Sequence, residues 1–240
     1  MPAAAVELRG LTHRYADGTA ALQGFDLRIA RGECVALIGP NGAGKSTLLQ
    51  HLNGLLLASS GEVLVEDLRV ERGTLAAVRE RVGFVFQHAQ DQLFMPTVAD
   101  DVAFGPTNQG LPPPEVQQRV QSALQAVGAA HLALRAPWRL SGGEQRMVAI
   151  AGVLAMRPAL LVLDEPSAEL DAAARERLVT LLRGLPLTRI LATHDLELAA
   201  QVATRVVVLE AGRIVADGDC REVLAQQPLL QRLGLRSVAA

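Results

Sequence analysis

The stretch Gly39-Pro40-Asn41-Gly42-Ala43-Gly44-Lys45-Ser46-Thr47 decides the fold of this chain. A short apolar run, residues 33–38, precedes it, and leucines at 48, 49, 52 and 55 follow it at helical spacing. A strand, a glycine-rich turn and a helix in that order are the setting in which the pattern Gly-x4-Gly-Lys-Ser forms a phosphate-binding loop. The sequence therefore predicts a nucleotide phosphate site at this turn.

The residue types of this loop each suit a phosphate. Backbone N–H groups at the start of the helix, together with the helix dipole, favour an anion. Lys45 supplies a compact positive charge, and it is the only lysine among the 23 basic residues of the chain. The Ser46 hydroxyl is a ligand for Mg²⁺. The nucleotide-binding residues that we expect here are Asn41, Gly42, Gly44, Lys45, Ser46 and Thr47.

Composition excludes several classes of protein. The chain has 240 residues, 50% of them hydrophobic, enough to bury a core in one domain or two close-set lobes. The net charge of -2 offers no positive excess for a nucleic acid, so we expect no such partner. Two cysteines in unrelated contexts and no visible secretory signal favour a cytosolic chain with reduced thiols. The most apolar stretch, residues 147–163, is broken by Arg157-Pro158 and is shorter than the roughly 20 residues that span a bilayer.

Strand and helix patterns alternate along the chain. Residues 160–164 and 189–193 are apolar strands followed by helical patterns at 172–183 and 196–202, which implies a parallel sheet covered on both faces. Residues 6–9 and 25–29 alternate apolar with polar side chains and predict a small antiparallel side sheet. Helical patterns at 97–104, 115–127 and 142–156 are joined by Gly105-Pro106 and Pro112-Pro113-Pro114. A hairpin at 205–216 and a short helix at 219–226 complete the pattern.

The predicted fold class is therefore α/β. We expect one domain over residues 1–240, with an α/β core and side sheet in residues 1–87 and 158–240. Residues 88–157 would form an inserted helical subdomain.

Two carboxylates, Asp164 and Glu165, follow the strand at 160–163. They would emerge at the carboxyl edge of the sheet, where open α/β folds bind ligands. Asp164 would hold the Mg²⁺ shell and Glu165 would polarise an attacking water. Taken alone, an acidic pair before Pro166 is more often a helix cap, but the upstream phosphate loop favours the catalytic interpretation.

The stretch Leu140-Ser141-Gly142-Gly143-Glu144-Gln145-Arg146 precedes a long apolar helix. Ser141 and Glu144 fit a capping box, so a well-capped helix is one interpretation. The two glycines also remove side chains from a helix N-terminus, which is typical of a second anion site. Two phosphate-binding helix ends in one chain require two anions or a second copy of the chain.

Together these residues resemble those of the ABC-type ATPases over nearly the whole chain. The phosphate loop, Gln87, the Leu140 to Gln145 stretch, residues 160–165 and 167–171, and Thr193-His194-Asp195 occur in the family's order and at similar spacings. The resemblance implies a P-loop ATPase cassette that uses ATP and Mg²⁺. It also implies an ATP-dependent, head-to-tail dimer in which the signature of one subunit, residues 140–145, closes over the nucleotide of the other.

The resemblance also assigns the remaining site residues. Tyr15 would stack on adenine, although an isolated tyrosine is also common in packing. Gln87 would sense the γ-phosphate and Mg²⁺, His194 would contact the γ-phosphate, and Asp171 would lie at the dimer seam. The expected catalytic residues are Glu165, His194 and Gln87; the metal ligands are Ser46, Gln87 and Asp164; the added nucleotide contacts are Tyr15, Ser141, Gly142, Gly143, Glu144 and Asp171.

One segment indicates the branch of the family. Residues 83–94 and 96–106 resemble the cobalt and energy-coupling-factor importers, whose ATPase docks beneath a transmembrane coupling protein that works with a substrate-capture membrane subunit. Asp91 and its neighbours would then form the transmission groove; a polar turn that caps a helix at Thr97 is the alternative. Glu169 departs from the glycine frequent in the family and would alter only seam packing.

The function we expect is ATP hydrolysis for such an importer, at the cytoplasmic face of the membrane and with cobalt as the first solute. A nickel or vitamin importer, or another ABC transporter, stays open, as does homodimer against heterodimer. A soluble ABC ATPase of DNA repair or ribosomes usually carries long insertions or a duplicated cassette, which this chain lacks. A nucleotide kinase would lack the Ser141 to Glu144 signature.

Overall fold

Fully buried strands form the centre of the structure, a computed structural model that describes residues 4–168 and 170–235. Glu169 lies outside the described residues. The chain divides into two compact units, each described by itself. Unit 1 comprises Met1–Val82, Ala159–Glu165 and Pro186–Ala240, and unit 2 comprises Gly83–Pro158 and Pro166–Leu185.

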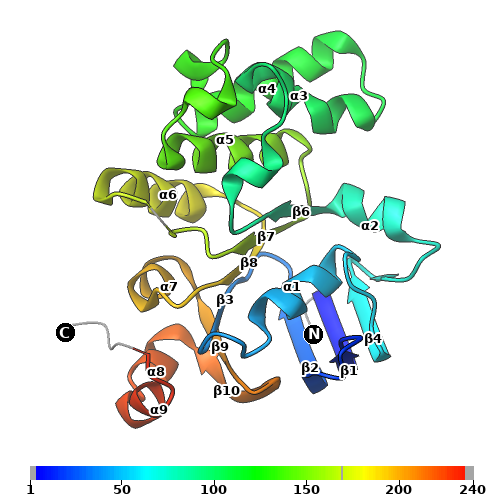
Figure 1. Ribbon diagram of the computed structural model, residues 1–240, viewed down its shortest axis with the longest axis vertical. Helices are drawn as coiled ribbons and strands as arrows, with labels where there is room; N and C mark the ends of the chain where they lie inside the picture. The colour runs from blue at the N-terminus through cyan, green and yellow to red at the C-terminus, as the bar shows by residue number, and fades with distance from the viewer. Residues whose placement is uncertain (1–3, 169, 236–240) are drawn as a thin grey trace. The chain divides into compact units, whose positions relative to one another are not determined.

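The elements follow the alternation expected of an α/β chain (Figure 1). The strands are β1 (Ala4–Arg14), β2 (Ala20–Ala30), β3 (Cys34–Ile38), β4 (Ser60–Val65), β5 (Leu68–Arg69), β6 (Val82–Val85), β7 (Leu160–Asp164), β8 (Thr188–Ala192), β9 (Arg205–Glu210) and β10 (Arg213–Asp219). The α-helices are α1 (Lys45–Leu52), α2 (Leu75–Arg81), α3 (Val98–Asn108), α4 (Pro113–Ala126), α5 (Gly142–Ala155), α6 (Ala172–Gly184), α7 (Leu196–Val202), α8 (Cys220–Leu224) and α9 (Gln227–Arg232). Short 3-10 helices lie at Ala89–Gln92, Ala130–Leu132 and Pro137–Arg139.

The core sheet of unit 1 is mostly parallel. Its strands lie in the order β10-β9-β3-β8-β7, with β3 parallel to both β8 and β9, and β7 parallel to β8. Every residue of β3 and β7 is buried, as expected for strands covered on both faces. Strand β10 pairs antiparallel with β9, so the parallel core and the predicted hairpin at 205–216 are both confirmed.

Glycine conformations shape the turn between β3 and α1. Gly44 is the N-cap of α1 and has a φ of 102°, a left-handed conformation that side chains disfavour. A Cβ on Gly44 would lie 2.7 Å from the carbonyl oxygen of Ala21, and one on Gly39 would meet the carbonyl oxygen of Leu209. No side chain caps the start of α1. The helix therefore begins with backbone N–H groups suited to an anion.

The antiparallel side sheet is larger than predicted. It has four strands in the order β2-β1-β4-β5, and Figure 1 shows β1, β2 and β4 side by side in blue and cyan. The expected strands at 6–9 and 25–29 are the centres of β1 and β2, and β1 continues past Gly10 through a register irregularity. Strands β4 and β5 were not predicted, because Ser59-Ser60-Gly61 reads as a turn and pairing with a distant strand leaves little local signal.

Unit 2 contains the three predicted helices, with one correction. Helices α3, α4 and α5 pack against one another. We expected Gly105-Pro106 to join two helices, but both residues lie inside α3. A Cβ on Gly105 would lie 2.8 Å from the sulfur of Met156, and the Gln109 side chain donates to the Met156 carbonyl at 3.2 Å. Close packing on α5 thus stabilises a helix that Pro106 alone would interrupt.

The end of the described chain is helical. Asp219 caps α8, with its carboxylate accepting from the Arg221 N–H at 2.8 Å, and the unpredicted α9 follows. Both cysteines are free and buried, and burial raises the pKa of the Cys34 thiol to about 11. Over the described ranges, no helix combines the length and apolar character needed to cross a membrane.

Candidate nucleotide site

Lys45 lies at the centre of the candidate phosphate site in unit 1. Its side chain is buried, and its Nζ donates to the carbonyl oxygens of Gly39 at 2.8 Å and Pro40 at 3.1 Å. Burial lowers the pKa of Lys45, while the carboxylates of Glu165 and Asp164 act in the opposite direction. An ammonium held in a desolvated loop is well placed to gain from an anion, because Coulomb attraction is stronger away from bulk water.

Ser46 and Asp164 meet at the carboxyl end of the core sheet. The Ser46 hydroxyl donates to Asp164 Oδ1 at 3.1 Å, and Asp164 is buried. A hydroxyl and a carboxylate are the hard oxygen ligands that Mg²⁺ accepts, and Mg²⁺ usually completes its shell with water and substrate phosphates. Accordingly, no group of three or more potential metal ligands (His, Cys, Asp or Glu) occurs among the described residues. The pair therefore fits a Mg²⁺ bound together with a nucleotide.

Glu165 is held in an unusual backbone conformation. Its φ is 46°, in the left-handed region where a side chain other than glycine is strained. Its Oε2 accepts from Thr193 Oγ1 at 3.3 Å and lies 2.9 Å from His194 Nδ1, and its own N–H donates to the Ala192 carbonyl at 2.9 Å. The fold thus fixes a buried carboxylate beside the imidazole of His194, whose side chain is 65% exposed.

Tyr15 and Thr47 join the side sheet to α1. The Tyr15 hydroxyl is 2.9 Å from Thr47 Oγ1, and Tyr15 remains 38% exposed. The tether at the hydroxyl holds the aromatic ring beside the phosphate loop, which suits the predicted contact with a base. Unit 1 therefore brings together the loop, Tyr15, Asp164, Glu165 and His194; the other expected residues belong to unit 2.

The signature stretch forms the N-terminus of α5 in unit 2. Ser141 Oγ accepts from the Glu144 N–H at 3.3 Å, while Glu144 Oε2 accepts from the Ser141 N–H at 2.8 Å and lies 2.9 Å from its Oγ. This is a complete capping box. Gly142 has open space around its Cα, so the same helix end stays free of side chains there. The helix end can therefore be capped and still bind an anion. For the Ser141 hydroxyl to donate to a phosphate, however, its bond to the Glu144 carboxylate must first break.

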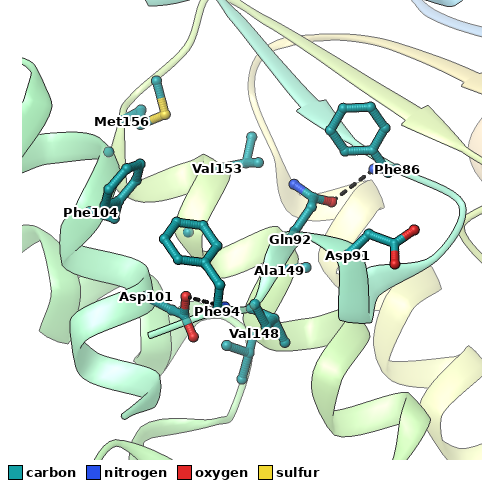
Figure 2. Close-up of a pocket in the computed structure, with 13 residues that line it drawn as sticks. Phe86, Asp91, Gln92, Phe94, Asp101, Phe104, Val148, Ala149, Val153 and Met156 are labelled. Atoms are coloured by element: carbon teal, nitrogen blue, oxygen red, sulfur yellow. Dashed lines mark hydrogen bonds between the residues drawn. The ribbon is translucent and has the colours of Figure 1, made fainter. Parts of the chain in front are cut away.

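A groove of about 280 Å³ lies in unit 2, next to the segment that follows Gln87 (Figure 2). Phe94 and Phe104 stand edge to face at its mouth, 4.9 Å between ring centres, and are 62% and 45% exposed. Asp101 anchors the segment from below, with Oδ1 accepting from the N–H groups of Phe94 and Met95 at 3.0 Å each. Val153 of α5 and Met156, the residue directly after that helix, complete the apolar lining.

Comparisons with known proteins agree with this geometry. The sequence pattern of the family described as ABC transporter matches residues 22–168. The chain belongs to that family. It is similar to the energy-coupling factor transporter ATP-binding protein EcfA of Methanothermobacter thermautotrophicus, with 48% identity covering 96% of this chain and 76% of that protein.

Two solved structures are also similar. CbiO1 of Clostridium perfringens, described as part of the ABC transporter complex CbiONQ, matches with a TM-score of 0.85 and 39% identity, covering 97% of this chain and 95% of that one. The dimeric ATP-binding cassette MJ0796 bound to ADP and phosphate matches with a TM-score of 0.81 and 29% identity, covering 90% and 99%. The chain is therefore an ABC ATPase that couples ATP hydrolysis to transport, and the predicted fold class and family are confirmed.

Sequence reasoning missed one residue that shapes unit 2 of this ABC ATPase. Arg146, buried in α5, donates from Nη1 to the Phe86 carbonyl at 2.6 Å and from Nη2 to the Gln87 carbonyl. It thus ties the start of the signature helix to the segment that carries the exposed Gln87. Only its position directly after the signature could have drawn attention to it. Asp171 caps α6, accepting from the Ala174 N–H at 2.7 Å, and its place at a dimer seam stays a prediction.

The capping box of the ABC signature gives a pH prediction. Bonds from the Ser141 backbone and hydroxyl hold the pKa of Glu144 below its ordinary value of 4.5. Since the unfolded chain binds the proton more readily, this contribution is present above pH 4.5 and is lost as the pH falls through the lower folded pKa. Glu144→Gln, which can still form the box, should flatten this acid loss. Thermal unfolding midpoints between pH 6 and 3 measure it; parallel curves for the two proteins would contradict it.

Proposed function

We propose that the chain is the ATP-hydrolysing subunit of an energy-coupling-factor type importer, with cobalt as the first candidate solute. The groove beside Phe94 and Phe104 is the observation that carries the proposal, because an exposed aromatic pair over an apolar trough suits a short helix of a partner. The CbiO1 and EcfA relatives support the same branch. A nickel or vitamin importer is the second candidate, because an ATPase of this kind does not touch the solute.

The residues of unit 1 would perform the hydrolysis as follows. Lys45 and the N-terminus of α1 bind the phosphates, and Tyr15 binds the adenine. Ser46 and Asp164 would hold Mg²⁺, which would supply charge neutralisation at the phosphates. Gln87 belongs to unit 2 and stays a ligand that only the family resemblance implies. Glu165 orients a water and accepts its proton; its strained, buried carboxylate is fixed for that task.

His194 has a proton requirement of its own. When its Nδ1–H donates to Glu165, a neutral ring presents only an acceptor at Nε2. Contact with a γ-phosphate oxygen therefore needs either a charged imidazolium or a rotation that releases Glu165. If the ring rotates, phosphate binding takes the imidazole away from Glu165 and frees that carboxylate for water. If the ring is a charged imidazolium, Nδ1–H keeps its bond to Glu165 while Nε2–H donates to the phosphate.

We propose a dimer of two such subunits that closes on ATP, with the signature of one copy facing the nucleotide of the other. The dimeric MJ0796 cassette supports this arrangement. The intact Glu165, His194 and signature allow both sites of a homodimer to act. Membrane subunits would comprise a coupling protein, seated on the groove at the cytoplasmic face, and a solute-capture protein.

Co-purification from membranes tests the groove. Phe94→Asp places a charge in the aromatic mouth and should reduce recovery of the membrane partners at least about tenfold, since burying an unpaired charge is costly. Leu134→Asp is the matched control, because Leu134 is 88% exposed in the same unit and does not line the groove. The tagged chain is purified from detergent-solubilised membranes, and its partners are identified by mass spectrometry.

Each outcome of that experiment is decisive. Recovery of a coupling protein with a metal- or vitamin-capture subunit, lost in Phe94→Asp and kept in Leu134→Asp, supports the importer and identifies its solute class. If Phe94→Asp recovers the membrane partners as well as Leu134→Asp does, the groove is not part of the interface. Recovery of soluble repair or ribosomal proteins alone would refute transport while leaving the ATPase assignment intact.

A further inference from the structure

Two buried histidines lie directly behind the nucleotide site of unit 1. His51 of α1 is fully buried and His13 of β1 is 8% exposed. His51 Nε2 is 3.2 Å from His13 Nδ1, and His51 Nδ1 is 2.7 Å from the carbonyl oxygen of Thr47. The two rings stand edge to face with centres 4.7 Å apart. They belong to elements far apart in the sequence, and neither has a role in the mechanism above.

The partners of His51 fix its protonation pattern. A carbonyl oxygen only accepts, so Nδ1 of His51 must carry a proton and donate to Thr47. Burial lowers the pKa of His51 and favours a neutral ring, so with Nδ1–H directed at Thr47 the other nitrogen, Nε2, is bare. His13 Nδ1–H then donates to that Nε2. The bonds form a directed chain from His13 through His51 to the first turns of α1.

The other side of His13 contacts the proposed adenine platform. The ring of His13 stands edge to face with Tyr15, 4.7 Å between centres and 82° between planes. The Tyr15 hydroxyl in turn meets Thr47 Oγ1 at 2.9 Å. Tyr15 is therefore held at two points, by Thr47 at its hydroxyl and by His13 at its ring, and both points lead back to residue 47.

A purely space-filling role does not account for this arrangement. Apolar side chains would fill the same volume without the cost of desolvating imidazole nitrogens. In addition, His13 Nε2 is buried and has no hydrogen-bond partner within the described residues, so the pair retains an unrecovered desolvation cost. The hydrogen bonds of the imidazoles fix the orientation of each ring, whereas apolar side chains in the same space could rotate.

We propose that His13 and His51 are positioning residues that set the plane of the Tyr15 ring and thereby the affinity of the site for the adenine base. The proposal rests on the proposed role of Tyr15. It separates two parts of nucleotide recognition. The phosphates depend on the loop and Lys45, whereas the base depends on a histidine pair that itself never touches the nucleotide.

Three substitutions of His51 distinguish this role from general support of the fold. His51→Leu removes both bonds. His51→Gln can place an acceptor toward His13, at the position of Nε2, and His51→Asn can place a donor toward Thr47, at the position of Nδ1. If the contact with His13 is what matters, Gln should restore the function that Leu loses, and Asn should not.

The readouts are the KM and kcat for ATP and the binding of inorganic tripolyphosphate, which has phosphates but no base. We expect His51→Leu to raise the KM for ATP about fivefold to tenfold, the size of a lost aromatic contact, with kcat and tripolyphosphate affinity unchanged. Tyr15→Ala should give the same pattern and is the reference. His131→Leu, the same change at an exposed histidine of unit 2, should change none of these values.

Each contrary result has a separate meaning. If His51→Leu weakens ATP and tripolyphosphate equally, or if Asn rescues and Gln does not, the histidines only support α1 and the proposal fails. If His51→Leu does not fold, the comparison of Gln with Asn still decides. If Tyr15→Ala leaves the KM for ATP unchanged, the adenine role of Tyr15 fails and the proposal with it. If Tyr15→Ala raises the KM for ATP and His51→Leu does not, the adenine role of Tyr15 is kept and the histidine proposal fails.

Discussion

Glu165→Gln should lower steady-state ATP hydrolysis by about 10²- to 10⁴-fold, the usual contribution of a positioned general base. The amide has nearly the shape of the carboxylate and can still accept from Thr193, so the strained backbone and its neighbours should persist. It cannot accept a proton from water. ATP should therefore bind and remain, and the closed dimer should accumulate.

Phosphate release, retention of labelled ATP and size-exclusion chromatography with ATP measure these three effects. Glu222→Gln is the matched control, because Glu222 is an exposed glutamate in α8 of the same unit and should leave turnover unchanged. Normal turnover in Glu165→Gln would remove Glu165 from the chemistry. Loss of ATP binding would instead show that the carboxylate supports the loop.

Lys45→Ala should weaken ATP binding by about 10- to 100-fold, the range for removing a hydrogen bond from a charged group. The side chain is buried among the carbonyls of Gly39 and Pro40, so its removal also leaves those acceptors without their donor. Lys45→Arg should not restore binding, because a planar guanidinium cannot take the place of a compact ammonium. Titration with a fluorescent ATP analogue measures the affinities.

Retained folding is the control for both lysine variants, assessed by circular dichroism and the thermal unfolding midpoint. Tripolyphosphate binding should fall in parallel with ATP binding, since Lys45 acts on the phosphates. An affinity within about threefold of the unaltered chain, well under the 1.4 kcal/mol of a tenfold change, would contradict the assigned role.

Local patterns predicted much of this fold. The phosphate loop, the buried strands β3 and β7, and the helices of unit 2 each depend on residues close in sequence, where apolar spacing and glycine placement are informative. The reach of α3 through Pro106 could not be predicted, because contacts with Met156 offset an unfavourable local residue.

The candidate site was predictable in its composition but not in its connections. Sequence motifs identified Lys45, Asp164, Glu165 and His194 as site residues. No sequence pattern predicts the positive φ of Glu165, because the surrounding fold imposes it. Arg146 and the pair His13 and His51 act through bonds to residues 38 to 60 positions away. Such bonds exist only after folding and leave no periodicity in the sequence.

The arginine bias of the chain has a practical consequence for chemistry on the intact transporter. Reagents that acylate side-chain amines can react with one ε-amino group in this subunit, that of Lys45, while the arginines stay inert. Because that amine is buried in the loop, its rate of acylation would report whether the loop is occupied by a nucleotide. Mass spectrometry of the Lys45 peptide from an assembled membrane complex would then measure the fraction of loops that hold a nucleotide.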